Sequence, residues 1–437
     1  MRNYYISLLP VFLALTGFSQ QLTTKVYYRD SLEFIRHRDS LQHAREISYR
    51  EKAREKLANY ESMADWSQIT SVDLSYLDLE TIPGFVFACT NLKRLELDHN
   101  NIKKIPRRLN KLDSLKYLDL SYNQRGTGTL SIGRNKNIIK LYLHGNGLSK
   151  LPRSTRRFRQ LTDIVLDRNN FTDIPSGLKK IRKLKRIDIN ENPLTFHKTD
   201  FSKLAHIETL KMIKCNIEEV PTGIGKMKAL RDLNFSNNRI SAISDETGQL
   251  QNLIKLSFYA NRLKSLPSSI LQLSNLEEID LYYNQLETIP DNVHELSRLE
   301  VLFLANNNLY TLPETIGQLP NLKKLYIHHN RLSYLPESFG QLSGLEVLHI
   351  QNNYFMDVPG VIFQLKNLED LDISANDITS LPHHFTTFTK LKYLFFQNNP
   401  IDLTLAENDH LSLTISTLKQ RGAIVRYNTL EQSLTIE

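Results

Sequence analysis

The sequence predicts an α/β solenoid in the shape of a horseshoe, with about 15 stacked repeats, a parallel β-sheet on the concave face and short helical or irregular segments on the convex face. Two observations predict this fold. A 23-residue period runs without insertion from Leu77 to Asn399, which are 322 residues, or 14 periods, apart. Within each period, apolar and polar residues alternate over a few positions. Self-similarity at a fixed period of this length indicates stacked supersecondary units.

One position marks the period, and it is Asn in nearly every unit. The Asn amide has two donor hydrogens and one acceptor oxygen, so we expect it to satisfy main-chain groups where the chain turns inside the stack. Leu77 stands at this position in the first unit. The predicted ladder of the other units is Asn100, Asn123, Asn146, Asn169, Asn192, Cys215, Asn238, Asn261, Asn284, Asn307, Asn330, Asn353, Asn376 and Asn399.

The unit around Asn330 illustrates the rest of the pattern. Leu325 and Ile327 alternate with polar residues, which is typical of a short, half-buried strand. Pro336 then fixes φ and removes a backbone donor, which suits a segment that has left the sheet. Phe339, three residues further on, starts an apolar spacing that indicates a short helical turn on the outer side.

This pattern resembles the leucine-rich repeat, specifically the 23-residue LPxxIxxLxxLxxLxLxxNxL form seen in intracellular scaffolds such as Scribble and Erbin and in plant Ras-group repeat proteins. The resemblance covers Ile69 to Asn399, about three quarters of the chain. It implies a curved solenoid with parallel strands on the concave side, and the family admits Cys215 in place of Asn. Because this scaffold hosts many unrelated binding roles, function has to be argued from the site.

The start of the chain predicts a signal peptide at residues 1–19. Arg2 precedes a short apolar run, and Gly17 and Ser19 are small residues before a cut at Gln20. The run is too short for a stable membrane-spanning helix. We therefore expect export to the periplasm, the cell surface or the medium. The alternatives are an uncleaved anchor and, if the N-terminus is retained, an intracellular protein.

Caps are expected on both sides of the solenoid at residues 66–399. Residues 20–65 read as a charged N-terminal helix and cap that starts near Asp30, with Trp66 sealing the first repeat, although a coiled-coil pairing helix is an alternative. Residues 400–437 read as a C-terminal cap, in which Leu411, Ile415 and Leu418 have helical spacing and a strand follows at 423–427. No second domain is expected.

Two cysteines, Cys89 and Cys215, are the only ones in the chain. They lie more than five repeats apart, which at the spacing of parallel strands is about 25 Å or more. A disulfide requires Cα atoms within about 7 Å. We expect two buried thiols, a pattern that weakly favours a bacterial exported protein.

A cluster of aromatic and His side chains is predicted on the concave face, where residues 23 positions apart become neighbours in one column. Such residues fit the composition of binding hot spots. Two alternatives remain: aromatic residues simply suit strands, or the three His form a zinc site, for which no fourth ligand is evident. The predicted partner-binding residues are Tyr259, Tyr282, Tyr283, Phe303, Tyr326, His328, His329 and His349.

An acidic row is predicted at the other end of the same face. Asp73, Glu96 and Asp119 share one column, with Asp98 beside them. Like charges about 4.8 Å apart repel one another, so this row favours a cationic partner. A calcium site is a second alternative. A surface that neutralises itself is the default, because basic residues such as Arg94 lie nearby.

A basic band lies between Arg153 and Arg186, where eleven Lys and Arg face three Asp, a net charge of +8 that equals the formal net charge of the whole chain. The band indicates an anionic partner. Outside the cytoplasm we favour an anionic lipid surface or an acidic glycan over nucleic acid, and a merely solvated face is the alternative. The predicted residues are Arg153, Arg156, Arg157, Arg159, Lys179, Lys180, Arg182, Lys183 and Lys185.

No enzyme signature is found, and no cofactor is expected. The spacing of Gly128 and Gly133 resembles a phosphate-binding loop, but Arg134-Asn135 stands where Lys-Ser/Thr is required. The preferred hypothesis is a non-enzymatic, exported scaffold that binds a protein or peptide on its concave face. An adhesion protein that holds an anionic surface and an intracellular signalling scaffold are the alternatives. The oligomeric state stays open.

Overall fold

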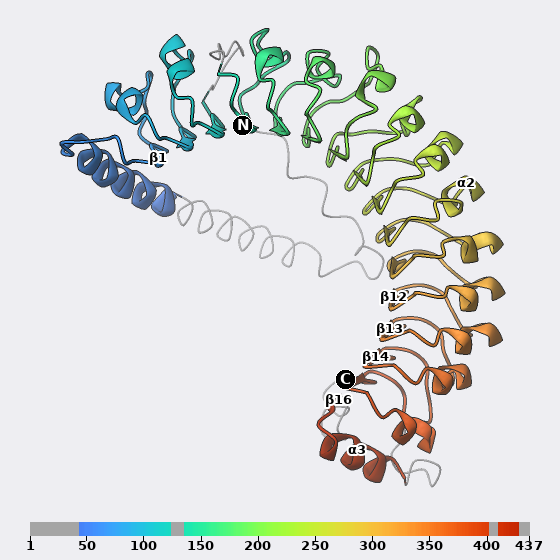
Figure 1. Ribbon diagram of the computed structural model, residues 1–437. Helices are drawn as coiled ribbons and strands as arrows, with labels where there is room; N and C mark the ends of the chain where they lie inside the picture. Colours follow the sequence, from blue (N-terminus) through green and yellow to red (C-terminus); the bar gives the residue numbers. More distant parts are fainter. Residues whose placement is uncertain (1–42, 124–134, 402–409, 428–437) are drawn as a thin grey trace, which may run out of the picture.

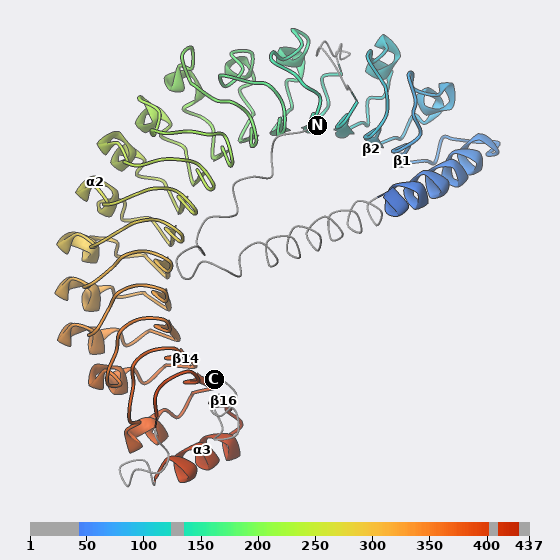
Figure 2. The ribbon, with the colours of Figure 1, turned by 180° about the vertical axis from the view of Figure 1, so that it is seen from behind.

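The computed structural model describes residues 43–123, 135–401 and 410–427. In it the chain forms an open arc with the strands on the inside and the short helical turns on the outside (Figures 1 and 2). The predicted signal peptide, the helix start at Asp30 and the stretch between Gly128 and Gly133 lie outside the described residues.

A single parallel sheet lines the arc, and its 16 strands follow one another in chain order. Each residue pairs with the residue one period further on, as Phe303 does with Tyr326, so the predicted solenoid with a parallel sheet is confirmed. The strands are β1 (Ser71–Asp73), β2 (Arg94–Glu96), β3 (Tyr117–Asp119), β4 (Lys140–Tyr142), β5 (Asp163–Val165), β6 (Arg186–Asp188), β7 (Thr209–Lys211), β8 (Asp232–Asn234), β9 (Lys255–Ser257), β10 (Glu278–Asp280), β11 (Val301–Phe303), β12 (Lys324–Tyr326), β13 (Val347–His349), β14 (Asp370–Asp372), β15 (Tyr393–Phe395) and β16 (Ile424–Arg426).

The outer side consists of single turns, mostly of 3-10 helix. Pro336 is extended, with φ −64° and ψ 153°, and the turn begins at the next residue. Phe339 within that turn is fully buried. The turns are η1 (Gly84–Ala88), η2 (Arg107–Lys111), η3 (Thr155–Arg157), η4 (Leu178–Lys180), η5 (Phe201–Leu204), η6 (Ile224–Lys226), η7 (Asp245–Gln249), α2 (Ser268–Leu271), η8 (Asp291–Glu295), η9 (Glu314–Gln318), η10 (Glu337–Gln341), η11 (Gly360–Gln364) and η12 (His383–Thr387).

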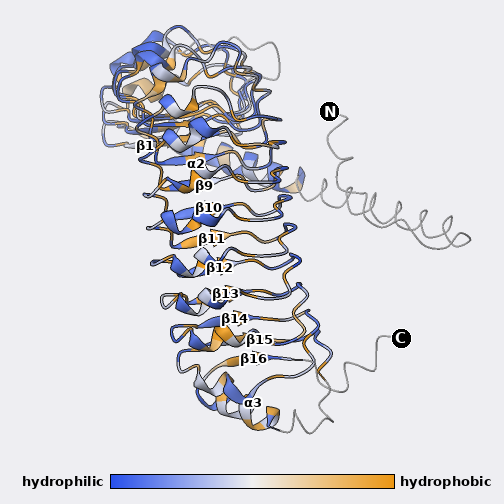
Figure 3. Cartoon of the chain, turned by 90° about the vertical axis from the view of Figure 1, so that its right-hand side faces the viewer, coloured by the Kyte–Doolittle hydropathy of each residue, from blue (hydrophilic) through white to orange (hydrophobic). Residues whose placement is uncertain are grey.

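Neighbouring turns approach closely where a glycine faces the next unit. A Cβ atom added to Gly317 would lie 1.9 Å from the carbonyl oxygen of Ser338, a distance that no real Cβ contact has. The core between turns and sheet is continuous, because the same apolar positions are buried in unit after unit. Figure 3 shows how apolar and polar residues alternate along the chain. Leu325 and Ile327 are both 0% exposed.

The predicted Asn ladder is present, and Asn330 shows how it works. Its amide nitrogen donates to Leu304 O at 3.0 Å and to Ile327 O at 2.9 Å, while its amide oxygen accepts from Leu309 N at 2.9 Å. One side chain therefore satisfies groups of its own unit and of the preceding unit. Because these backbone groups are buried, each would cost free energy if left unpaired.

Cys215 takes over the hydrogen-bond donor role of the Asn side chain but not its acceptor role. Its thiol lies 3.4 Å from Ile189 O and from Ile213 O, as an Asn nitrogen would. It has no oxygen to accept a hydrogen bond, and the backbone N–H of Leu194 donates instead to Asn192 O at 2.9 Å. The chain after Asn192 thus has its own hydrogen-bond pattern, and Leu194-Thr195-Phe196-His197-Lys198 stands there in place of the Leu-x-x-Leu-Pro sequence of other units. Both cysteines are buried free thiols, as predicted.

The residue before each ladder position has a positive φ. Tyr283, Asn306 and His329 have φ values of 55°, 55° and 51°. This left-handed conformation lets the chain leave the strand sharply, and Asn tolerates it better than most residues. Side chains in this column project at the edge of the concave face.

The two ends of the core are covered. Residues 43–61 form a helix, and Trp66 donates its ring N–H to Tyr60 O at 2.8 Å while its ring lies 6.2 Å from that of Phe85. At the other end, α3 (Leu411–Gln420) buries Leu411, Ile415 and Leu418, and β16 extends the sheet. None of the helices in residues 43–123, 135–401 and 410–427 is long and apolar enough to span a membrane.

Candidate functional site

The predicted concave cluster is a set of neighbouring rings on β11 to β13 and on the residues that follow β9, β10 and β12. The rings of Phe303 and Tyr326 are stacked, with centroids 4.9 Å apart and an interplanar angle of 11°. The ring of His349 meets Tyr326 edge-on at 5.0 Å. The column that the sequence predicts is therefore continuous across three strands.

The remaining predicted residues join the same cluster. Tyr282 lies 5.9 Å from Phe303 between ring centroids, and its hydroxyl is hydrogen-bonded to His328 two units away. The rings of Tyr259 and Tyr283 are 5.5 Å apart. His329 lies 5.5 Å from His328. All eight predicted residues are thus brought together, with Tyr283 the most exposed of the tyrosines here at 50%.

A group of buried polar atoms without hydrogen-bond partners continues this surface toward the C-terminus. Sequence reasoning missed three of its members, because a Gln or Asp in a strand column is unremarkable until its partners are known. His349 Nε2 lies 3.3 Å from Asp370 Oδ1, but the two are not aligned as a hydrogen bond. The atoms of this group are His328 Nδ1, His349 Nε2, Gln351 Oε1, Asp370 Oδ1 and Gln397 Oε1.

Burial shifts the titration of the central groups. It lowers the pKa of His328 to about 4, helped by the nearby His349 and His329, because a charged imidazole is poorly solvated there. Burial also raises the pKa of Tyr282 to about 12. Both side chains are therefore neutral near pH 7 and present hydrogen-bonding atoms and ring faces instead of charge. Among the described residues, no group of three or more His, Cys, Asp or Glu is arranged to hold a metal ion.

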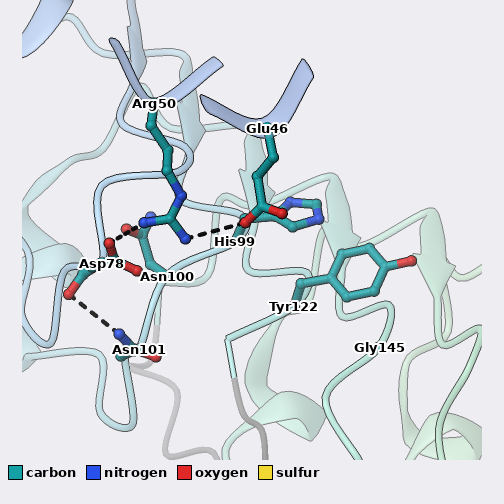
Figure 4. A pocket seen from close by; sticks show the side chains of 8 residues that line it. All are labelled: Glu46, Arg50, Asp78, His99, Asn100, Asn101, Tyr122 and Gly145. Carbon is teal, nitrogen blue, oxygen red and sulfur yellow. Dashed lines mark hydrogen bonds and ion pairs between the residues drawn. The ribbon is translucent and has the colours of Figure 1, made fainter. Parts of the chain in front are cut away.

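The acidic row at the N-terminal end already has partners within the chain. Asp73 accepts from Lys56 of the helical segment at 2.5 Å. Arg50 of the same helix forms ion pairs with Asp78 and, at 3.2 Å, with Glu46. These three residues line a cavity of about 220 Å³, which Figure 4 shows. The cation that this row was predicted to attract is thus supplied in part by the protein's own helix.

A second aromatic ladder lies beside this row. The ring of His99 stacks on Tyr76 at 4.1 Å and on Tyr122 at 4.3 Å, and Tyr49 of the helix stacks on Tyr76 at 5.5 Å. Sequence reasoning missed this ladder. Tyr76, His99 and Tyr122 are spaced by 23 residues in the column that also holds Tyr283 and His329, so the same column rule would have found them.

The basic band is divided by the structure. Lys183 donates to Gln160 at 2.6 Å and Lys185 pairs with Glu208 at 2.7 Å, so these two are engaged within the chain. The side chains of the other seven have no ion-pair or hydrogen-bond partner in the described part of the chain. They are Arg153, Arg156, Arg157, Arg159, Lys179, Lys180 and Arg182.

Two models of known protein families match the sequence of this chain. The family described as "Leucine-rich repeat region" matches residues 189–302, and the one described as "Leucine rich repeat" matches residues 67–124, 274–332, 297–355 and 343–401. The chain belongs to the leucine-rich repeat family. A stretch of 99 residues of this chain is 33% identical to the human volume-regulated anion channel subunit LRRC8A. This match spans 22% of this chain and 12% of that relative's length.

Solved leucine-rich repeat structures share the fold. The Leptospira interrogans LRR protein LIC12759 superposes with a TM-score of 0.69 and 26% identity, covering 85% of this chain and 98% of that one. A chain of the Drosophila Toll–Spatzle complex superposes with a TM-score of 0.61 and 22% identity, covering 74% of this chain and 46% of that one. The second likeness establishes the fold alone.

Proposed function

We propose that this leucine-rich repeat chain is an exported, non-enzymatic recognition protein that binds a protein or peptide partner on the C-terminal half of its concave face. The observation that carries the proposal is the juxtaposition of half-buried stacked rings with buried polar atoms that lack partners. Native proteins seldom leave such atoms unpaired. A bound partner that supplies the missing donors and acceptors would account for them.

The two halves of the surface have different roles in this proposal. The rings of Phe303 and Tyr326 offer a flat apolar face on which a partner side chain packs, as aromatic anchors do in binding hot spots. His328 Nδ1 and Gln351 Oε1, one column away, supply the hydrogen bonds that fix its orientation. The Toll–Spatzle complex is a precedent for a protein ligand among similar folds.

The test is affinity purification from the native host with the full chain as bait, quantified by mass spectrometry. F303A/Y326A should lose the proteins that the unmodified chain retains. The matched control is V165A/K211A, because Val165 and Lys211 lie in the same strand column four to seven units away. The control should retain them. Equal recovery by F303A/Y326A and the control, with equal thermal stability, would reject the concave site.

Export is tested separately. The predicted signal peptide at residues 1–19 implies that the mature chain begins near Gln20. Mass spectrometry of the native N-terminus should find that start. A chain that retains Met1 in the cytoplasm would favour the intracellular scaffold instead.

A further inference from the structure

A hollow of about 550 Å³ lies on the flank of the solenoid where the chain runs from the Asn ladder to the outer turns of three consecutive units. Its floor is apolar, since Phe171 and Ile174 line it and are 1% and 4% exposed. The cations that line it come from all three units. They are Lys150, Arg153, Arg156, Lys179, Lys180 and Lys198.

None of these six side chains has an ion-pair or hydrogen-bond partner among the described residues. One acid, Asp173, also lines the hollow. Its carboxylate accepts from the backbone of Lys198 at 2.6 Å and from the hydroxyl of Thr199 at 3.3 Å, so its hydrogen bonds come from neutral groups and not from the six cations. Because the six cations outnumber this one carboxylate, the lining of the hollow is net positive.

A buried hydroxyl without a partner lies in the same hollow. Thr155 lines it and is 2% exposed, and its Oγ1 atom has no hydrogen-bond partner. The equivalent residues of the next three units, Leu178, Phe201 and Ile224, are apolar, whereas Thr247 in the fourth unit is buried with an unpartnered hydroxyl like that of Thr155. The unpaired hydroxyl therefore does not define the hollow by itself, but a ligand held by the six surrounding cations would give it a partner.

A second hollow lies at the equivalent position eight units further along, and its comparison with the basic hollow shows which features come from stacking and which from the local charges. It has about 490 Å³ and is lined by Tyr334, Met356 and Asp357 among others, with no Lys or Arg. Glu337 stands there at the position that Arg153 occupies in the basic hollow. Stacking alone therefore creates such a hollow, whereas the basic lining distinguishes this hollow from the other one.

We propose that the basic hollow binds a ligand that presents two or more phosphate groups. Lys and Arg donate charge-assisted hydrogen bonds to phosphate oxygens, six cations exceed what a single phosphate can engage, and the Thr155 hydroxyl completes the donor set. The source of the phosphates is either a soluble polyphosphorylated molecule or the headgroups of an anionic lipid surface. This site is separate from the concave face.

The experiment uses the full chain and two probes. Inositol hexakisphosphate, followed by isothermal titration calorimetry, represents the soluble source. Phosphatidylcholine vesicles with and without phosphatidylglycerol, followed by sedimentation, represent the lipid source. We expect saturable binding to at least one probe that weakens as salt is added. Saturable binding of inositol hexakisphosphate identifies a soluble ligand, and binding only to the anionic vesicles identifies a lipid surface.

The variants locate the site. R153E/K179E should weaken binding by at least about tenfold, because it reverses two cations of the hollow. R157E/R182E changes the net charge equally with cations that do not line the hollow and should weaken binding by less than about threefold. T155V should weaken binding several-fold without lowering the melting temperature. Equal losses in the two charge-reversal variants, or no saturable binding to either probe, would overturn the proposal.

Discussion

The ammonium group of Lys56 lies 2.5 Å from the carboxylate of Asp73 and joins the N-terminal helical segment to the first strand of the sheet. Burial of Asp73 raises its pKa, but the hydrogen bonds from Lys56 and Ser75 outweigh burial and leave the pKa below its usual value. The acid row predicted to attract a cation from outside is thus partly occupied by the chain itself. Docking of the helix consequently depends on a titratable contact.

We predict that K56M loosens the helix at residues 43–61 while the solenoid stays folded. Because the folded-state pKa of Asp73 is lowered, the pair contributes stability above the unfolded pKa of about 4, and this contribution is lost as the pH falls through the lowered value. An exposed pair of this kind contributes at most about 1 kcal/mol. Hydrogen exchange of residues 43–61 should be faster in K56M at pH 7 and equal in both proteins in acid. Equal exchange at pH 7 would show that Lys56 does not hold the helix.

Gly317 should tolerate no side chain. G317A would place a Cβ atom 1.9 Å from the carbonyl oxygen of Ser338 and should destabilise the protein by about 1–3 kcal/mol through overpacking. The matched control is G177A, because a Cβ at Gly177 meets nothing within 4 Å and its φ is −65°. Urea midpoints measure both. Similar midpoints for the two variants would contradict the close approach of the outer turns.

The Asn ladder should reveal its two functions separately. N330A leaves Leu309 N, Leu304 O and Ile327 O without their partner and should cost at least about 2 kcal/mol. N330C should cost less, because the Cys215 thiol shows that sulfur can reach the two carbonyl oxygens. Chemical denaturation of both variants gives the comparison. A cysteine variant as unstable as the alanine variant would mean that the amide oxygen is the dominant group.

His328 should titrate far below an ordinary histidine. Its pKa is lowered to about 4, so the neutral form is favoured in the folded state. Its contribution to stability is therefore complete above the unfolded pKa of about 6.5 and is lost as the pH falls toward the lowered value. Histidine proton shifts by NMR should give a midpoint below about 5 for the signal that H328Q removes. A midpoint near 6.5 would place His328 in water.

Some of these relationships could be predicted from the sequence and others could not, for physical reasons. The stacking of Phe303 on Tyr326 follows from the period, because a fixed repeat length fixes the strand register. The contact between Lys56 and Asp73 has no such basis, since the helix lies outside the period and nothing in its sequence sets its orientation. The unpaired state of Gln351 and Asp370 depends on side-chain conformation, which a column position does not determine.

The basic hollow could be predicted from the sequence only in part. The charge excess around Arg153 and Lys179 is visible in the sequence. Their division into cations that line a hollow and cations that do not depends on how three units pack together. Lys198 joins the hollow from the unit that precedes Cys215, and the burial of Thr155 is known only from the structure.

The helices that cover the two ends of the core, residues 43–61 and α3, determine where the stack of repeats stops. A stack of identical modules has no intrinsic end, since each one offers the next an open strand edge and an apolar face. Without residues 43–61 and α3, separate molecules would add head to tail and grow into a filament. Light scattering of a chain cut back to residues 62–401 should reveal such growth, whereas the intact chain, with a helix over each end, should stay at a finite size.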